Sequence, residues 1–262
     1  MNPDDPVWGG FYGNYGLPED EIHVWRTTLD MAVSGFAKLQ QILSSDERER
    51  ADRFHFEVDR RRGVIGRGCL RLLLGQILDL PANELQFEYD EFGKPGLIPR
   101  HDLPLQFNVS HSGDLILIAI TIGRAVGVDV ERIRTDLDPD GIAARFFSAD
   151  ERKILASLAG PVRYQAFFTC WTRKEAYLKA KGVGLSLPLD QFDVSFLPNE
   201  TPRLLATRPD SAEAARWRLE ALDVAAGYVA ALAAPGSAWK LKCWNWHPLL
   251  LTDGAARIDL IR

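Results

Sequence analysis

The feature that most constrains the fold of this chain is an internal repeat. Residues 44–48 read SSDER, and residues 148–152, 104 positions later, read SADER. Both match a capping box, a serine followed three residues later by a glutamate, which predicts the start of a helix. At the same offset, IHVWR at residues 22–26 and VGVDV at 126–130 have the period-2 alternation of a half-buried strand. A strand followed by a capped helix therefore occurs twice.

Each half continues with a long helix, predicted over residues 59–78 and 163–181, and then with strands. The strands are predicted over residues 85–89, 105–109 and 115–122 in the first half, and over 192–196, 217–224, 228–232 and 239–246 in the second. Helices grouped ahead of sequence-adjacent strands are typical of an α+β fold with a largely antiparallel sheet. We therefore predict two similar α/β halves, related by a pseudo-twofold axis, with a ligand site in the cleft between them.

The predicted division is an N-terminal half over residues 1–122, a C-terminal half over 123–235 and a C-terminal tail over 236–262. The tail carries Trp239, Trp244 and Trp246. These either pack on the N-terminal half or form a surface for a partner.

Composition excludes several classes of protein. With 46% hydrophobic and 26% charged residues among 262, the chain is globular rather than disordered or coiled-coil. Its net charge of −5 provides no basic field that would attract nucleic acid or an anionic membrane. The three cysteines have no zinc or disulfide spacing, and the sequence shows neither a signal peptide nor a run long enough to span a bilayer. We therefore expect a cytoplasmic protein whose anion site is local.

An acidic motif lies on the second predicted strand. In GVDVE, Asp129 and Glu131 share one face and stand about 7 Å apart, twice the rise per residue. Gly127 has the same facing, which would leave room there for a bulky ligand. On the second long helix, Glu175 and Lys179 are four residues apart and face the same way.

These groups allow two interpretations. One is a solvated strand face and an ordinary surface salt bridge. In the other, Glu175 joins Asp129 and Glu131 in a three-carboxylate cluster, which repulsion would destabilise unless a divalent cation lay between them. Oxygen-only ligands favour Mg²⁺ or Mn²⁺, and Mg²⁺ recruits substrate phosphates, which indicates a diphosphate substrate.

Together these residues resemble the signature of a known family. The motifs are Gly127-Val128-Asp129-x-Glu131, Phe146-Phe147, Trp171-x-x-Lys174-Glu175-Ala176-x-x-Lys179 and Gly182-x-Gly184-Leu185, with Gly93-Lys94-Pro95 and Asn108-Val109-Ser110-His111-Ser112 in the first half. Over roughly residues 20–235, the chain resembles the 4′-phosphopantetheinyl transferases of the surfactin-synthetase-activating (Sfp) type.

The resemblance implies an activity and a fold. The activity is that of a holo-acyl-carrier-protein synthase: 4′-phosphopantetheine moves from coenzyme A to a serine of an acyl or peptidyl carrier protein, and 3′,5′-ADP is released. The fold is that of two similar halves with coenzyme A in the cleft between them. The resemblance further implies Mg²⁺, with Mn²⁺ as an alternative, held by Asp129, Glu131 and Glu175. The implied catalytic set is Glu175 as base, Lys179 as the cation facing the leaving diphosphate, and Asp129.

The resemblance also implies contacts with the substrates. The residues implied for coenzyme A are Arg50, Arg62, which faces its 3′-phosphate, Lys94, Ser110, His111, Lys174 and Lys179. Glu47 departs from the pattern, since the best-known members have lysine there, and Arg48 is the candidate substitute. Arg132, Arg134 and Arg145 are candidates for a rim that binds an acidic carrier protein. We expect a monomer whose partners are the carrier and coenzyme A, with no nucleic acid and no membrane.

Two alternatives stay open at this point. One is another metal-dependent phosphoryl-transfer enzyme, such as a nuclease or nucleotide hydrolase, that uses the same three acids. The other is a carrier-binding protein that has kept the fold without turnover. The crowded carboxylates argue against the second, because a protein without chemistry has no physical need for them.

Overall fold

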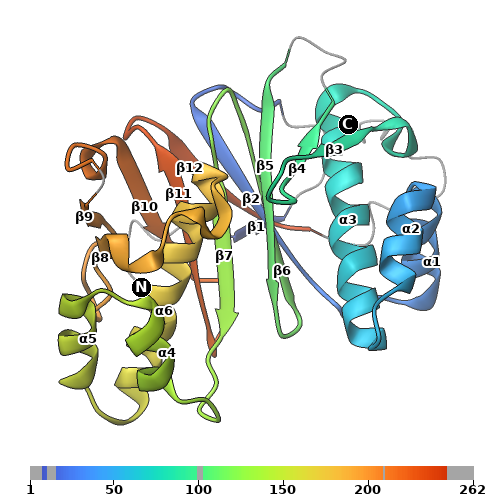
Figure 1. Cartoon of the computed structure of the whole chain (residues 1–262). Coiled ribbons are helices and arrows are strands. Elements are labelled where there is room, and N and C mark those ends of the chain that lie inside the picture. The colour runs from blue at the N-terminus through green and yellow to red at the C-terminus, as the bar shows by residue number, and fades with distance from the viewer. Residues whose placement is uncertain (1–7, 11–15, 99–102, 209, 247–262) are drawn as a thin grey trace. The chain divides into compact units, whose positions relative to one another are not determined.

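The computed structural model describes residues 8–10, 16–98, 103–208 and 210–246, and within it the chain divides into two compact units (Figure 1). Within the described residues, the N-terminal unit comprises those up to Gly123 together with 241–246. The C-terminal unit is formed mainly by Arg124–Lys240. Each unit has its own buried hydrophobic cluster.

The N-terminal unit is built on a five-stranded sheet in the order β1-β12-β2-β6-β5. Its elements are β1 (Trp8–Gly10), β2 (Glu21–Thr28), α1 (Val33–Ile42), α2 (Ser45–Asp52), α3 (Glu57–Leu78), η1 (Ala82–Glu84), β3 (Phe87–Tyr89), β4 (Pro95–Leu97), β5 (Leu105–Ser112), β6 (Leu115–Ile122) and β12 (Lys240–Asn245). Strands β2, β6 and β5 pair antiparallel, and β1 pairs with β12 in parallel. Helix α3 packs against β6, and α1 and α2 pack against α3 (Figure 1).

The C-terminal unit is built on a three-stranded antiparallel sheet in the order β10-β11-β7. Its elements are β7 (Gly127–Arg132), α4 (Pro139–Phe146), α5 (Ala149–Ala156), α6 (Gly160–Lys181), η2 (Gly184–Ser186), η3 (Leu189–Gln191), β8 (Phe192–Val194), β9 (Leu204–Thr207), η4 (Ala214–Arg216), β10 (Trp217–Ala221) and β11 (Tyr228–Pro235). Helix α6 packs along β7 and β11.

The two units repeat one topology. Apart from β1 and β12, which occur only in the N-terminal unit, each begins with a strand, continues through three helices and a short two-stranded ribbon, and ends with two strands that return to the first. The order β5-β6-β2 in one unit is matched by β10-β11-β7 in the other. The predicted α+β fold of two similar halves is therefore confirmed. The pseudo-twofold axis and the cleft between the halves stay predictions.

Both predicted capping boxes begin helices. At the start of α5, Ser148 Oγ accepts a hydrogen bond from the Glu151 amide, and Glu151 Oε2 accepts one from the Ser148 amide at 3.0 Å. At the start of α2, Glu47 Oε2 accepts from the Ser44 amide at 3.1 Å. Each carboxylate thus satisfies a backbone donor that the first helical turn leaves open.

The same two glutamates are buried and pair with a cation from the long helix of their own unit. Arg71 Nε lies 2.6 Å from Glu47, and Lys174 Nζ lies 2.8 Å from Glu151. Arg71 also donates to the carbonyls of Ala82 and Leu85, in the segment that leads from α3 into β3. In each unit, the glutamate of the SxxE motif and its cation partner therefore connect three successive segments: the start of the short helix, the long helix and the segment that follows it.

Several boundaries differ from the sequence prediction. The long helices begin earlier, at Glu57 and Gly160, and β5 runs on to Ser112. Helices α1 and α4, of ten and eight residues, were not predicted, because neither begins with a capping box of the SxxE kind that identified α2 and α5. In the described part of the chain, no helix has the length and apolar character needed to cross a bilayer.

Two of the three C-terminal tryptophans, Trp244 and Trp246, pack on the N-terminal unit, the first of the two predicted alternatives. Strand β12 lies between β1 and β2 in the sheet. The amide of Trp246 donates to the Arg26 carbonyl at 2.9 Å, and its ring is buried in the core of this unit. Trp239 lies instead in the C-terminal unit, where its ring contacts the guanidinium of Arg218.

Candidate active site

The acidic face of β7 packs against α6. A Cβ added to Gly127 would lie 2.1 Å from the Ala176 carbonyl oxygen and 2.3 Å from the Ala180 amide nitrogen. The expectation that Gly127 leaves room for a ligand is therefore wrong, because the backbone of α6 fills that space. Asp129 follows two residues later on the same face and is 4% exposed, so the close approach of α6 brings its carboxylate beside the helix.

Glu175 and Lys179, on α6, meet these acids. Lys179 Nζ lies 2.5 Å from Asp129 Oδ1. Burial raises the pKa of the half-buried Glu175 carboxyl; the Asp129 charge raises it further, Lys179 opposes the shift, and Glu131 adds a smaller increase. Glu175 thus lies within electrostatic reach of both strand carboxylates. The structure pairs Lys179 with Asp129, 50 positions apart in the sequence, and Glu175 experiences the charges of both strand acids.

The donor chemistry of this cluster fits a hard divalent cation. Three carboxylates supply oxygen ligands only, which Mg²⁺ and Mn²⁺ prefer. Burial raises the pKa of Glu175 most, and the charges of Asp129 and Glu131 add to the increase; a bound cation would offset these charges. Within the described residues, no group of three or more histidine, cysteine, aspartate or glutamate side chains is arranged to hold a metal as it stands.

Lys174 lies elsewhere in the C-terminal unit. Its side chain is fully buried, and its ammonium contacts Glu151 at 2.8 Å and the Leu189 carbonyl at 2.7 Å, with a further hydrogen bond to the Phe192 carbonyl. All three protons of the ammonium are therefore used inside the protein. The structure gives Lys174 no surface for a substrate, and we leave it out of the proposed site.

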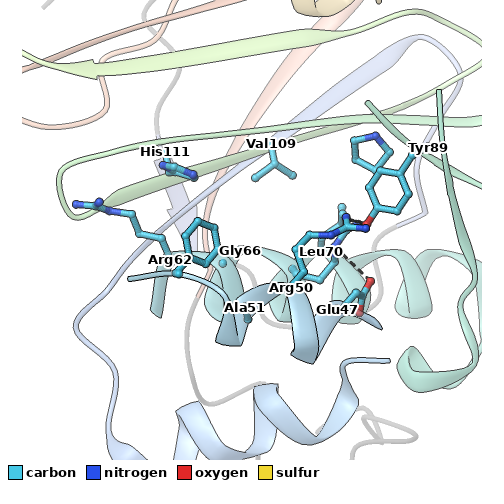
Figure 2. A pocket seen from close by; sticks show the side chains of 13 residues that line it. Glu47, Arg50, Ala51, Arg62, Gly66, Leu70, Tyr89, Val109 and His111 are labelled. Atoms are coloured by element: carbon cyan, nitrogen blue, oxygen red, sulfur yellow. Dashed lines mark hydrogen bonds and ion pairs between the residues drawn. The ribbon is translucent and has the colours of Figure 1, made fainter. Parts of the chain in front are cut away.

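The N-terminal unit contains a cavity of about 210 Å³ between α2, α3, β3, β4 and β5. Three of the residues implied for coenzyme A line it, namely Arg50 from α2, Arg62 from α3 and His111 from β5. Figure 2 shows Arg62 and His111 on one side and Tyr89, Arg50 and Glu47 on the other. Val109 and Leu70 contribute an apolar wall between them. The cavity can therefore hold an anionic ligand that also carries an apolar ring.

Two other implied contacts do not line this cavity. Lys94 lies in the turn between β3 and β4, and burial lowers its pKa while Asp90 opposes the shift. Ser110 is buried, and because neighbouring strand residues alternate, it faces away from the side of β5 that carries Val109 and His111. Arg48, the candidate substitute at Glu47, is exposed and donates to the Leu43 carbonyl instead.

Among the polar side chains that line the cavity, the sequence reasoning did not assign Arg67 and Tyr89 to a ligand site. Residues 63, 66, 67 and 70 of α3 all line it. Their spacing of three and four residues marks one helix face, so helical periodicity around Arg62 could have included Arg67. No comparable signal exists for Tyr89, which reaches the cavity from the β3–β4 ribbon.

Comparison with known proteins covers both units. Residues 24–122 match the family model "4′-phosphopantetheinyl transferase, N-terminal", and residues 125–233 match the 4′-phosphopantetheinyl transferase superfamily. The chain is 40% identical over 234 residues to the 4′-phosphopantetheinyl transferase HetI of Nostoc sp., which covers 89% of this chain and 95% of HetI. The chain belongs to the 4′-phosphopantetheinyl transferase family.

Other members of the family are similar over a shorter stretch. The transferase Sfp of Bacillus subtilis strain 168 is 34% identical over 159 residues, 60% of this chain and 68% of Sfp. The transferase psf-1 of Bacillus pumilus is 37% identical over 156 residues, 59% of this chain and 64% of psf-1.

This phosphopantetheinyl transferase has the family's fold, with its two units matching the N-terminal and C-terminal family models. It is an enzyme that attaches phosphopantetheine to a carrier protein. Members of the family generally use coenzyme A and Mg²⁺. The predicted family, fold and transferase activity are thereby confirmed.

Proposed function

We propose that this transferase moves 4′-phosphopantetheine from coenzyme A to a carrier-protein serine with the acidic cluster of the C-terminal unit, and binds coenzyme A in the cavity of the N-terminal unit. The observation that carries the proposal is the Lys179–Asp129 ion pair of 2.5 Å next to Glu175, whose pKa is raised. The reaction requires two groups from the protein, a carboxylate that accepts the serine proton and a cation that stabilises the leaving group, and Glu175 and Lys179 supply them.

Glu175 is proposed as the general base. A serine hydroxyl is a weak nucleophile, so its proton must leave as the oxygen attacks the β-phosphate. A carboxylate accepts that proton more readily when its pKa lies closer to neutrality, which is the direction in which burial and Asp129 shift Glu175.

Lys179 is proposed to face the leaving group. Negative charge builds on the departing 3′,5′-ADP as the phosphorus–oxygen bond breaks, and a fixed ammonium nearby stabilises that charge. Asp129 holds Lys179 through their ion pair and so keeps the cation at the cluster.

Asp129, Glu131 and Glu175 are the residues that would hold Mg²⁺, or Mn²⁺ as an alternative. When bound, the ion would neutralise charge on the diphosphate of coenzyme A. This ligand set is supported by its oxygen-only chemistry and by the electrostatic contact of Glu175 with both acids.

For coenzyme A we propose Arg50, Arg62 and His111, which line one cavity. Lys94 and Ser110 stay predictions of the resemblance. The carrier rim also stays a prediction; it is supported by the exposure of all three of its members, Arg132, Arg134 and Arg145.

One experiment tests the proposal. The protein is incubated with coenzyme A, Mg²⁺ and an apo carrier protein, and the carrier is weighed by mass spectrometry. We expect the mass of phosphopantetheine on its serine and free 3′,5′-ADP, with loss of both when Mg²⁺ is chelated and recovery when it is returned. Hydrolysed nucleotide with an unmodified carrier would favour the hydrolase alternative, and association without any product would favour the binding protein.

Variants test the assigned roles. Glu175→Gln should lower kcat by at least about 100-fold while calorimetry still detects binding of coenzyme A. Arg62→Ala should mainly raise the KM for coenzyme A. Glu220→Gln, in the half-buried Arg218–Glu220 pair of the same unit, is the matched control and should leave both constants unchanged. If Glu175→Gln kept the wild-type kcat, Glu175 would not be the general base.

We also propose a reducing, cytoplasmic setting and a monomeric enzyme. The setting is supported by the three cysteines, which are all buried and form no disulfide with one another. Light scattering on the purified protein tests the monomer, and a stable dimer would contradict it.

A further inference from the structure

Two guanidinium groups meet at one tyrosine in the cavity of the N-terminal unit. The Arg50 guanidinium carbon lies 4.2 Å from the centroid of the Tyr89 ring. Arg67 Nη2 donates a hydrogen bond of 2.6 Å to the Tyr89 hydroxyl. Two like charges around one side chain repel each other, and an anion that both can contact relieves that repulsion.

The nearby carboxylate does not fully neutralise this pair. Glu47 Oε2 lies 2.6 Å from Nε of the buried Arg71 and also accepts from the Ser44 amide. Arg67 Nε lies farther away, 3.3 Å from Glu47 Oε1. Glu47 is therefore engaged by the capping box and by Arg71, and the surroundings of Arg67 and Arg50 stay positive.

Arg67 also has donor capacity that the protein does not use. Its Nη1 is buried and has no hydrogen-bond partner among the residues that the structure describes. A guanidinium carries five N–H donors, and a buried charged donor without an acceptor is costly. The group is thus complete only when an additional acceptor binds.

We propose that Arg67, held by Tyr89 beside Arg50, is a specificity-determining residue that recognises the phosphate monoester of coenzyme A. This inference rests on the proposed function, in which this cavity binds coenzyme A. A phosphate monoester carries close to two negative charges and three acceptor oxygens, which suit two planar guanidinium groups. In coenzyme A that monoester is the 3′-phosphate of the adenosine, while the other two phosphates form the diphosphate.

The rest of the cavity fits the same fragment. Val109 and Leu70 supply an apolar wall for a flat base. About 210 Å³ is smaller than the usual site of a drug-sized ligand, so the cavity suits a nucleotide fragment rather than the whole of coenzyme A.

The test compares coenzyme A with 3′-dephospho-coenzyme A in the carrier assay. Wild type should prefer coenzyme A in kcat/KM. Arg67→Gln should lower that preference about 10- to 100-fold, mainly through the KM for coenzyme A, because it removes hydrogen bonds to a charged group. Tyr89→Phe, which removes only the hydroxyl that holds Arg67, should lower it a few-fold. Arg60→Gln on the same helix, whose side chain pairs with Glu57 at 2.8 Å, is the control and should leave the preference unchanged.

Binding separates this inference from the proposed function. Adenosine 3′,5′-bisphosphate and adenosine 5′-monophosphate are titrated into each variant by calorimetry, which needs no turnover. We expect Arg67→Gln to weaken the binding of adenosine 3′,5′-bisphosphate and to leave the binding of adenosine 5′-monophosphate unchanged. A wild-type protein that modifies no carrier refutes the proposed function, yet the two nucleotides still test Arg67.

Unchanged selectivity in Arg67→Gln, or equal weakening of both nucleotides, overturns the inference. Loss of selectivity in Arg62→Gln combined with unchanged selectivity in Arg67→Gln overturns it as well, because the phosphate monoester would then be recognised by Arg62, which lies across the cavity (Figure 2). Should Arg67→Gln fail to fold, as judged by circular dichroism, Tyr89→Phe decides the question, since it keeps the ring that Arg50 contacts.

Discussion

The buried Glu151–Lys174 pair should stabilise the C-terminal unit rather than bind substrate, and Lys174→Met tests this. Methionine is an unbranched side chain only one heavy atom shorter than lysine, and it carries no charge. The substitution leaves Glu151 with the backbone donors of Ser148 and Val194, both at 3.0 Å. It also takes a donor away from two carbonyls in the segment that leads into β8.

The size of the effect follows from burial. Lys174 is 0% exposed and the Glu151 side chain 3% exposed, so water cannot replace the lost partner. Removing one member of a buried pair costs about 3–5 kcal/mol, because the other charge stays buried and uncompensated. That is a large part of the total of about 5–15 kcal/mol by which a folded protein is stable.

Urea unfolding, followed by tryptophan fluorescence and circular dichroism, measures this loss. Lys153→Met is the matched control: Lys153 is 76% exposed and pairs with Asp150 on the surface of α5, so we expect a change below about 1 kcal/mol. In a cycle with Glu151→Gln, the double variant should lose less than the sum of the single losses. The reasoning is refuted if Lys174→Met keeps its unfolding free energy within about 1 kcal/mol of wild type and raises the KM for coenzyme A.

Three further predictions concern packing, pH and thiols. Gly127→Ala should lower stability by about 3 kcal/mol or more, because its Cβ would overlap the backbone of α6, whereas Gly16→Ala, with open space around it, should be nearly neutral in thermal unfolding. Lys181 holds the pKa of the Glu213 carboxyl below its usual value, so the carboxylate stabilises the fold at neutral pH and loses this effect as the pH falls through its folded pKa. Glu213→Gln should therefore lower the urea midpoint at pH 7. It should also make the decrease of that midpoint between pH 7 and roughly pH 3.5 smaller than in wild type, and a decrease as large as in wild type would contradict this. The three buried cysteines should not react with Ellman's reagent until urea unfolds the chain, and rapid labelling of the native protein would show that a thiol is accessible.

The sequence by itself determined the features that depend on local spacing. Both SxxE motifs begin helices because a capping box involves only four consecutive residues. Strand periodicity places Asp129 and Glu131 on one face of β7, and helix periodicity places Glu175 and Lys179 on one face of α6. The duplicated order of elements, and with it the fold class, could be predicted for the same reason.

Only the tertiary structure decided which of these faces meet. Lys174 and Glu175 are neighbours in one motif, yet Lys174 turns into the core to pair with Glu151 while Glu175 stays at the acidic cluster. Arg67 and Tyr89 are brought together by the packing of a helix against a distant ribbon. No spacing rule reports such contacts, because they depend on how closely two backbones approach. At Gly127 that approach leaves no room for even one methyl group, and this is why the carboxylate of β7 reaches the lysine of α6.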